Sequence, residues 1–427
     1  MTTLIGTKPN QETNLPRGPG ALRVAYIMSR FPKLTETFVL NEIRELSDQG
    51  HEVEIWPLQR ERTDVMHRAA RRFVDEAHFT PWLSHKYLWS HARFFLKSPW
   101  VYLGILWTLL RANWGSRRFL VGAVAYFPKA VYLADQFERR GIRHVHAHFA
   151  SHPAMAAWVI HKLTGISYSF TAHGSDLHRD QHMLIDKVES ASAVIAISQD
   201  NRRMIQNLCG EDFAERVRVV HCGVDAAQFS RRKPRRETDA PFSILCIGTL
   251  HEVKGQSYLL KACRILMEEG RDFVCHFIGD GEDLSLLERL ARPLEGRVRF
   301  HGRKTAGEIR ELLQNADVLV APSVPTASGR REGIPVVLME ALNSGVAVIA
   351  SELSGIPELV RHEQTGLLAP PRDSIALASA IRRLMDDPDL RERLADEGHE
   401  LVRREFDLKI NANTLAGIFQ ECVGASC

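Results

Sequence analysis

The stretch Arg331-Glu-Gly-Ile-Pro-Val-Val-Leu-Met-Glu-Ala-Leu342 places two carboxylates, Glu332 and Glu340, eight residues apart. Gly333 favours a loop and Pro335 favours the first turn of a helix, so Glu340 is expected about one turn inside that helix. A helix start offers unpaired backbone N–H groups and a positive dipole end, which suit a phosphate. Two acids beside a phosphate fit a nucleotide sugar, one for sugar hydroxyls and one for ribose hydroxyls. The alternative is a pair of solvated surface acids.

The residues on both sides of this stretch predict alternating strands and helices. Residues 315–323 indicate a short buried strand that ends at the loop, and residues 345–351 indicate the next strand. Residues 355–358, Gly-Ile-Pro-Glu, predict a turn into another helix. Such alternation is typical of a parallel, doubly wound sheet.

With these flanks the segment resembles the retaining glycosyltransferases of family 4. Their signature is two glutamates separated by seven residues, then a strand of small residues and Ser-Gly-Ile-Pro-Glu, which stands here at residues 354–358. The resemblance covers most of residues 22–400 and implies the GT-B fold, in which two Rossmann-like domains face a central cleft. It also implies that Glu332 holds the donor sugar and Glu340 the ribose. The backbone groups that would steady the departing diphosphate belong to Gly333, Ile334, Pro335 and Val336.

Length and composition agree with two domains of a soluble protein. A chain of 427 residues is long enough for two domains, each with its own core. The net charge of +3 is too small to indicate a nucleic-acid partner. Seven cysteines without a Cys-x-x-Cys pair indicate reduced thiols in the cytoplasm. The first twenty residues lack an apolar signal core, so we expect a disordered tail and no secretion.

Polar and charged residues 230–241 separate two series of predicted strands. Strands are expected first at 22–28, 50–56, 143–149, 167–171 and 193–197, and then at 242–248, 273–279, 298–301, 317–321 and 346–350. We therefore divide the chain into a disordered tail, an N-terminal acceptor-binding domain, a linker, a C-terminal donor-binding domain and a C-terminal helix that packs back towards the N-terminal domain, at residues 1–20, 21–225, 226–241, 242–403 and 404–427.

The loop after the first strand of the second series carries Gly248 and Lys254, and a helix is expected to begin at about Gln256. Family members usually have Gly-Arg-Leu here and a later Lys-Gly, whose cations bind the donor diphosphate. The resemblance therefore assigns Gly248 and Lys254 to the donor site, although an ordinary exposed lysine is the alternative. Thr249 stands where the arginine is expected. The missing cation can come from Arg303, Arg330 or Arg331.

The motif Phe170-Thr-Ala-His-Gly-Ser-Asp176 follows a strand of the first series. Gly174 permits a sharp turn that directs His173 into the cleft, and the resemblance assigns His173 a hydrogen bond to the transferred sugar. Upstream, three histidines alternate in Arg-His-Val-His-Ala-His-Phe and share one strand face. Three imidazoles can ligate zinc, but family members carry His-Ala-His-Phe without a metal. We assign no metal and expect His146 and His148 to line or brace the cleft.

The segment Ala77–Ala134 contains no Asp or Glu, but it has seven basic residues. It also holds five of the seven tryptophans, which recur every seven residues within 82–89 and 100–114 and so lie near one helix face: Trp82, Trp89, Trp100, Trp107 and Trp114. Anionic membrane surfaces select basic amphipathic helices rich in Trp and Phe. No apolar run is long enough to span a bilayer. We expect membrane-facing helices near 82–130; the alternative packs several tryptophans inside the domain.

Residues 29–43 contain Phe-Pro-Lys-Leu-Thr-Glu-Thr-Phe in place of the Gly-Gly loop common in the family. This pattern resembles the branch with colanic-acid-type and other exopolysaccharide glycosyltransferases, which extend polyprenyl-diphosphate-linked oligosaccharides at the inner face of a bacterial membrane. The resemblance implies a cytoplasmic, peripheral, retaining hexosyltransferase that uses a nucleotide-sugar donor and such a lipid-linked acceptor. Candidates for contacts to the diphosphate or the acceptor are Arg303, Arg331 and His148.

The resemblance also implies front-side attack, in which the departing diphosphate deprotonates the incoming hydroxyl and the protein positions charge. Nothing resembles the Asp-x-Asp metal motif of the other main glycosyltransferase fold, so we expect neither a divalent ion nor another cofactor. Two alternatives remain. A nucleotide-sugar 2-epimerase shares this architecture but needs no membrane-directed surface. A non-catalytic nucleotide-sugar-binding protein would fit the change to Thr249.

Overall fold

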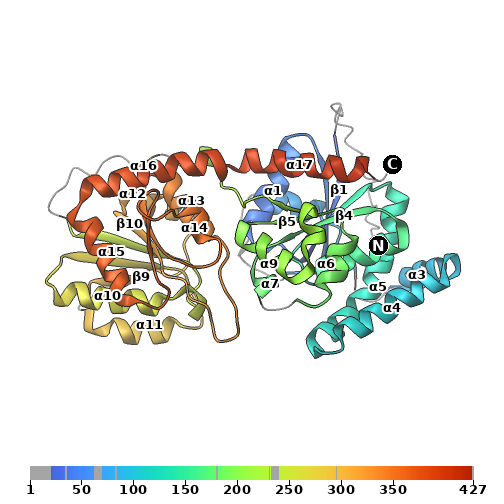
Figure 1. The fold of residues 1–427 in the computed structure, drawn as a ribbon, viewed down its shortest axis with the longest axis horizontal. Coiled ribbons are helices and arrows are strands. Elements are labelled where there is room, and N and C mark those ends of the chain that lie inside the picture. Colours follow the sequence, from blue (N-terminus) through green and yellow to red (C-terminus); the bar gives the residue numbers. More distant parts are fainter. Residues whose placement is uncertain are drawn as a thin grey trace, which may run out of the picture.

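The computed structural model describes residues 21–33, 36–61, 70–81, 84–178, 181–229, 231, 240–294 and 296–425. Within these residues the chain forms two α/β domains that lie side by side (Figure 1). Each contains a six-stranded parallel sheet, so the expected doubly wound GT-B fold is confirmed. The predicted tail at 1–20, Trp82 and most of the predicted linker lie outside the described residues.

The N-terminal sheet has the strand order β2-β1-β3-β4-β5-β6. Its strands are β1 (Arg23–Phe31), β2 (Glu52–Arg60), β3 (His144–His148), β4 (Ser167–Ala172), β5 (Ala193–Ala196) and β6 (Val217–Val219). Its helices are α1 (Thr37–Asp48), α2 (Ala70–Glu76), α3 (His85–Lys97), α4 (Pro99–Asn113), α5 (Arg117–Arg140), α6 (His152–Thr164), α7 (Ser175–His178), α8 (Leu184–Ser190) and α9 (Gln199–Cys209).

The C-terminal sheet has the order β12-β11-β10-β7-β8-β9. Its strands are β7 (Phe242–Ile247), β8 (Phe273–Ile278), β9 (Val298–Phe300), β10 (Val318–Ala321), β11 (Ala347–Ser351) and β12 (Leu367–Ala369). The helices that follow β7 are α10 (Gln256–Glu268), α11 (Leu284–Ala291), α12 (Ala306–Asn315), α13 (Val336–Asn343), α14 (Ile356–Leu359), α15 (Ser374–Asp386), α16 (Pro388–Glu405) and α17 (Leu408–Gly424).

Both sheets are buried on both faces, which explains why most strands are continuous apolar runs. A parallel sheet needs helices on each face, so alternate residues cannot be left for solvent. Every residue of β10 and β11 is buried. β3 is also buried throughout, although three of its five residues are histidines. These buried imidazoles need hydrogen-bond partners within the protein.

The last two helices connect the domains (Figure 1). α16 packs on α13 and β11 in the C-terminal domain, and α17 packs on α1, β3 and β4 in the N-terminal domain. The break between them lies at Asp407, whose carboxylate accepts the Lys409 N–H at 2.9 Å and caps α17. The backbone of Asp407 also bridges to Val224. The chain thus crosses between the domains twice at neighbouring positions.

Helices α3 and α4 form a hairpin that lies at the far end of the N-terminal domain (Figure 1). We call residues 85–118, which run from the start of α3 to the first residues of α5, the arm. Both helices of the hairpin pack on α5. Ser116 caps the start of α5 and Gly141, with a φ of +67°, ends it. No helix of the described residues is long and apolar enough to cross a membrane.

Candidate active site

Both sheets carry predicted site residues beside a topological switch point, where successive connections leave in opposite directions. In the C-terminal sheet this point lies between β7 and β10, and the loops after these strands carry Lys254 and Glu332. In the N-terminal sheet it lies between β1 and β3. His148 ends β3, and His173 follows the neighbouring β4. All four residues lie at the carboxyl ends of strands, where α/β proteins bind ligands.

The two loops with His173 and Glu332 meet across the domain boundary. A Cβ atom added to Gly333 would lie 3.2 Å from the carbonyl oxygen of His173, and one added to Gly174 would lie 3.7 Å from the Gly333 Cα. A second contact between the two domains involves the next loop of each: the Glu358 carboxylate accepts the backbone N–H of Gln199 at 2.8 Å. The structure therefore brings the predicted sugar-binding residues of both domains together.

Lys254 and Glu332 form an ion pair. The Lys254 Nζ–Glu332 Oε2 distance is 2.6 Å, and neither side chain is more than 23% exposed. After Lys254 the chain turns at Gly255, where φ is +66° and a Cβ atom would lie 1.9 Å from the carbonyl oxygen of Pro322. Only glycine fits between these two loops. A diphosphate that approached Lys254 would therefore compete with Glu332 for the ammonium group.

Glu340 lies on α13, the helix predicted to begin at Pro335, and its side chain is half-buried. Burial raises the pKa of Glu340 to about 7, and Arg310 opposes this rise. A desolvated carboxylate gains from any hydroxyl that donates to it. The position thus suits an acceptor for the ribose hydroxyls of a bound nucleotide.

His173 is 9% exposed and is held on several sides. Its backbone N–H donates to Asp176 at 2.9 Å, and its ring lies 4.7 Å from Phe38 and 4.6 Å from Phe149 between centroids. Burial and the neighbouring His148 hold the pKa of His173 well below its usual value. The ring is therefore neutral at physiological pH, and it can donate from one nitrogen and accept at the other.

The buried histidines of β3 find their partners on β4 and α1. His146 has Nδ1 at 2.8 Å from Ser169 Oγ and Nε2 at 3.0 Å from Thr171 Oγ1. His148 has Nδ1 at 3.0 Å from His173 Nε2 and Nε2 at 3.1 Å from Glu42 Oε1. Each imidazole thus uses both nitrogens. His148 is buried and bonds to the ring of His173, which it braces. Its contact with the diphosphate or the acceptor stays a prediction.

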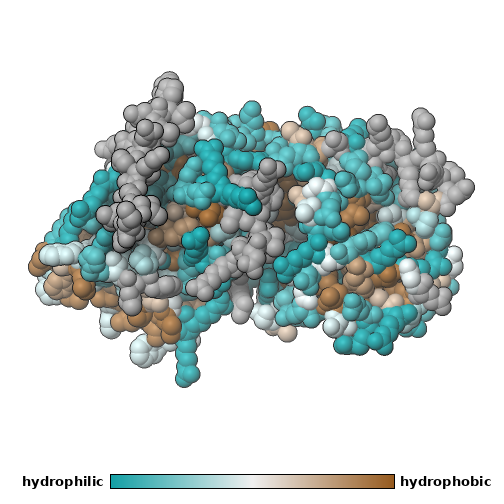
Figure 2. Space-filling view, turned by 180° about the vertical axis from the view of Figure 1, so that it is seen from behind, coloured by the Kyte–Doolittle hydropathy of each residue, from teal (hydrophilic) through white to brown (hydrophobic). Residues whose placement is uncertain are grey.

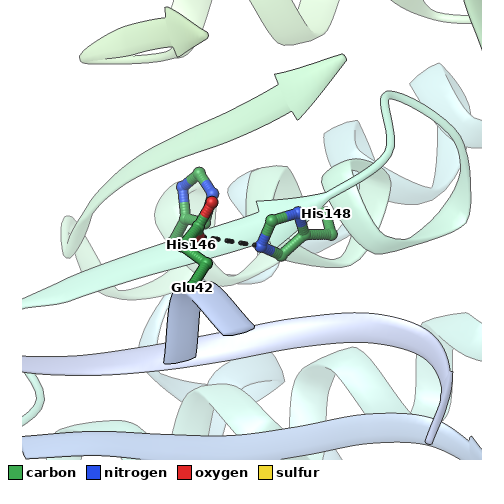
Figure 3. A group of neighbouring side chains, drawn as sticks. All are labelled: Glu42, His146 and His148. Atoms are coloured by element: carbon green, nitrogen blue, oxygen red, sulfur yellow. Dashed lines mark hydrogen bonds and ion pairs between the residues drawn. The ribbon is translucent and has the colours of Figure 1, made fainter. Parts of the chain in front are cut away.

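Glu42, His146 and His148 also form a group of the kind that can hold a metal ion (Figure 3), with ligand atoms within 4.8 Å of one another. The nitrogens of His146 point to hydroxyl partners on β4, and the nitrogens of His148 are engaged by His173 and Glu42. A hydrogen-bond network therefore accounts for this group, and the expectation of no metal stays a prediction.

The arginines considered as substitutes for the missing cation have other surroundings. Arg303 is 74% exposed and lies 3.4 Å from Asp280. The backbone N–H of Arg330 donates to Thr326. Arg331 lines an open pocket of about 570 Å³ between the domains, together with His178, Asp200, Arg203, Met204, Asn207, Leu208 and Gly329. Among the described residues, Lys254 is the one cation within ion-pair distance of Glu332.

Two family models match the chain. The model described as "Glycosyl transferases group 1" matches residues 228–401, and the one described as "Glycosyltransferase Family 4" matches residues 108–228. AmsK of Erwinia amylovora, an amylovoran biosynthesis glycosyltransferase, is 31% identical over 381 residues, which are 85% of this chain and 90% of AmsK. The chain belongs to this glycosyltransferase family.

WcaL of Escherichia coli K12, named for a glycosyltransferase of colanic acid biosynthesis, supports the same conclusion. It is 30% identical to this glycosyltransferase over 418 residues, which are 93% of the chain and 100% of WcaL. The resemblance seen in residues 29–43 is therefore confirmed at the level of the family.

Solved structures share the fold at much lower sequence identity. Anabaena HepE, solved in complex with UDP, has a TM-score of 0.70 at 17% identity and covers 94% of this chain and 100% of its own. The lipopolysaccharide outer core galactosyltransferase WaaB has a TM-score of 0.65 at 19% identity, with 94% and 100% covered. At these identities the likeness shows the GT-B fold alone.

Proposed function

We propose that this glycosyltransferase moves a hexose, with retention of its anomeric configuration, from a nucleotide sugar to a polyprenyl-diphosphate-linked oligosaccharide in exopolysaccharide biosynthesis. The observation that carries the proposal is the contact between the loops of His173 and Glu332, from two domains, together with the ion pair between Glu332 and Lys254. A cation, a carboxylate and a neutral imidazole at the ends of parallel strands suit a charged donor with sugar hydroxyls.

The donor would lie on the C-terminal domain. Lys254 would neutralise its diphosphate, with the backbone N–H groups at the start of α13. Glu340 would accept the ribose hydroxyls, and Glu332 the hydroxyls of the sugar. HepE is solved in complex with UDP-glucose, which supports a nucleotide-sugar donor for a chain of this fold.

The chemical step needs no protein nucleophile in this proposal. The bond from the anomeric carbon to the diphosphate oxygen breaks, and a bond from that carbon to the acceptor oxygen forms on the same face. The acceptor proton passes to the departing nucleoside diphosphate. Lys254, released from Glu332 by the donor, would stabilise the charge that develops on the diphosphate.

The arm would dock on the membrane. Its exposed residues include four tryptophans that are 67% to 84% exposed, and the alternative that packs them inside the domain is wrong for all four. These exposed side chains are Leu88, Trp89, Phe95, Leu96, Trp100, Val101, Leu103, Trp107, Leu110 and Trp114. Figure 2 shows apolar surface gathered at this end of the molecule. A soluble monomer rarely exposes so large an apolar area without a partner.

The basic residues of the arm fall into two groups. Arg93 pairs with Asp135 and with Glu138, at 2.6 Å for the latter, and Lys97 lies 3.3 Å from Glu138. These two hold the arm to α5 and so contribute less to a membrane field. The remaining basic residues are exposed: Lys86, Arg111, Arg117 and Arg118. A positive edge around an apolar face suits anionic lipid at the inner face of the bacterial membrane.

Phe119 of α5 directly follows the arm in sequence, and its ring lies 4.7 Å from the His182 ring. His182 follows closely on His178, which lines the pocket with Arg203 and Arg331. Arg331 is the neighbour of Glu332 in the chain. We propose that anionic groups of the membrane-anchored acceptor pass through this pocket.

The experiment is incubation of the purified protein with labelled nucleotide sugars, with and without membrane lipid extract. The proposal predicts label in the lipid fraction and an axial or equatorial linkage that matches the donor. An inverted linkage would contradict retention. Isomerised nucleotide sugar without lipid would favour the 2-epimerase, and binding without chemistry would favour a non-catalytic protein.

A further inference from the structure

A hydrogen-bonded chain of four side chains leads to His173 from the N-terminal sheet. Tyr26 Oη lies 2.8 Å from Glu42 Oε1, Glu42 Oε1 lies 3.1 Å from His148 Nε2, and His148 Nδ1 lies 3.0 Å from His173 Nε2. Figure 3 shows the Glu42–His148 link. Tyr26 and His148 are fully buried.

Phe38 and Glu42 both lie within residues 29–43, the stretch whose motif resembles the exopolysaccharide branch of the family. Both lie on α1, which packs on α17 and β2. Phe38 packs against the His173 ring at 4.7 Å, while Glu42 reaches His148 behind it. Two residues of this stretch thus contact His173 and the histidine that bonds to it.

The donor and the acceptor of each hydrogen bond in this series can be assigned from Tyr26 and Glu42. Burial and Glu42 raise the pKa of Tyr26, so this phenol stays protonated and donates. The Glu42 carboxylate can only accept. In its form with a single proton, His148 donates from Nε2 to Glu42 and accepts at Nδ1. His173 must in turn donate from Nε2 to His148.

We propose that Glu42 and His148 are positioning residues that fix His173 as the Nε2–H tautomer and so present its Nδ1 atom as a hydrogen-bond acceptor to a sugar hydroxyl. Among the described residues, His173 Nδ1 has no hydrogen-bond partner. The inference rests on the proposed sugar transfer for its purpose, but the tautomer itself is a property of the protein alone.

This assignment has a chemical consequence. A sugar hydroxyl can donate or accept, so either tautomer of His173 could bind one. A fixed acceptor lets the hydroxyl donate to the ring and leaves its lone pairs free for other donors in the site. If the hydrogen bonds ran in the opposite direction, His173 would present an N–H to the same hydroxyl, and the hydroxyl oxygen would have to accept it. The carboxylate of Glu42 selects one of these two arrangements, as a buried acid commonly does for a histidine ring.

The first test is nitrogen NMR of protein labelled with ¹⁵N-histidine, because nitrogen shifts distinguish the two tautomers and the imidazolium form. The signals would be assigned with His148→Gln and His173→Gln variants. We expect the Nε2–H tautomer for both His148 and His173 in the free protein. An Nδ1–H tautomer of His173, or a doubly protonated His148, would overturn the proposal, whether or not transfer activity has been found.

The second test is Glu42→Gln, which keeps the shape and removes the charge. We expect the Nε2–H form of His173 to become a mixture and kcat to fall about tenfold, while the donor Kd changes less than about twofold. The matched control is Glu45→Gln, one turn further along α1, which bonds Gln49 and should change neither. An unchanged tautomer in a folded Glu42→Gln variant would refute the role of Glu42.

A third variant, Tyr26→Phe, removes one hydrogen bond to Glu42 and keeps the buried ring. Its effect on kcat should be smaller than that of Glu42→Gln and in the same direction. If the three residues serve folding alone, all variants would lower the thermal midpoint without changing the His173 tautomer or the ratio of kcat to donor affinity. That pattern would also refute the proposal.

Discussion

At the contact between the domains, polar side chains are gathered and engage one another, whereas on the arm large apolar side chains face solvent. Lys254 is paired with Glu332, and His173 is bonded to His148 and Asp176. Trp100 and Trp107, by contrast, are 84% and 67% exposed. The polar side chains of the first region bond to one another, whereas no other part of the described chain covers the apolar side chains of the second. We infer that chemistry and docking are divided between them.

The largest expected effect is on docking. Replacing Trp89, Trp100 and Trp107 by serine should weaken binding to anionic vesicles by roughly a thousandfold, because each exposed indole gains more than about 1 kcal/mol on entering the interface. Vesicle flotation measures this. Serine at Ile375 and Ile410, which are exposed away from the arm, is the control. Equal flotation of the tryptophan variant and wild type would show that the arm does not bind lipid.

The charged edge of the arm should contribute less. Replacing Arg111, Arg117 and Arg118 by glutamine should weaken vesicle binding by about a hundredfold at low salt, at about 1 kcal/mol per cation, and by much less at high salt. The control with the same change in net charge replaces three exposed arginines of the C-terminal domain, Arg264, Arg289 and Arg292. If both triple variants lose binding equally, net charge rather than this edge controls it.

Arg93 and Lys97 sharpen the same comparison. Because they pair with Asp135 and Glu138, their replacement should lower the thermal midpoint. It should weaken vesicle binding less than the replacement of Arg111, Arg117 and Arg118 does. Sequence alone could not separate the two groups. The acid-free segment ends at Ala134, and the partners begin one residue later, on a helix that folds back against the arm.

In the contact region, Glu332→Gln should reduce sugar transfer by at least about tenfold while the protein remains folded, because a neutral amide forms weaker bonds to the donor sugar and to Lys254. Initial rates with saturating donor and circular dichroism are the measurements. Glu352→Gln, an exposed glutamate of the same domain, is the control. Wild-type turnover in the variant would remove Glu332 from the mechanism.

The smallest effect is expected at Glu340. Its folded pKa of about 7 lies above the ordinary value of 4.5, so this glutamate lowers stability progressively as pH rises from about 4.5 to about 7. Glu340→Gln should therefore raise the thermal midpoint by about 2 °C or more at pH 8, and by less at pH 5. The same variant should bind donor several-fold more weakly at pH 8. Calorimetry at pH 5 and pH 8 measures the change in midpoint at each pH. A lower midpoint of the variant at pH 8 would contradict the raised pKa of Glu340.

The fold and much of the site could be predicted from sequence because they depend on local patterns. The strands are apolar runs, and Glu332, Lys254 and His173 each stand in a short motif beside a turn residue. The distances between elements could not be predicted in this way. Lys254 and Glu332 are 78 residues apart, and Glu42 and His148 are 106 apart. A helix period places the tryptophans on one face, but it does not say whether that face is covered.

The most direct test of this division is transfer to two acceptors, a lipid-linked oligosaccharide in anionic vesicles and a short soluble fragment of it without lipid. The triple tryptophan variant should lose transfer to the vesicle-bound acceptor and keep wild-type rates with the soluble one. Glu332→Gln should lose transfer to both. If the tryptophan variant, folded by its thermal midpoint, loses both activities equally, or if Glu332→Gln keeps either one, the division of docking and chemistry between the arm and the domain contact is wrong.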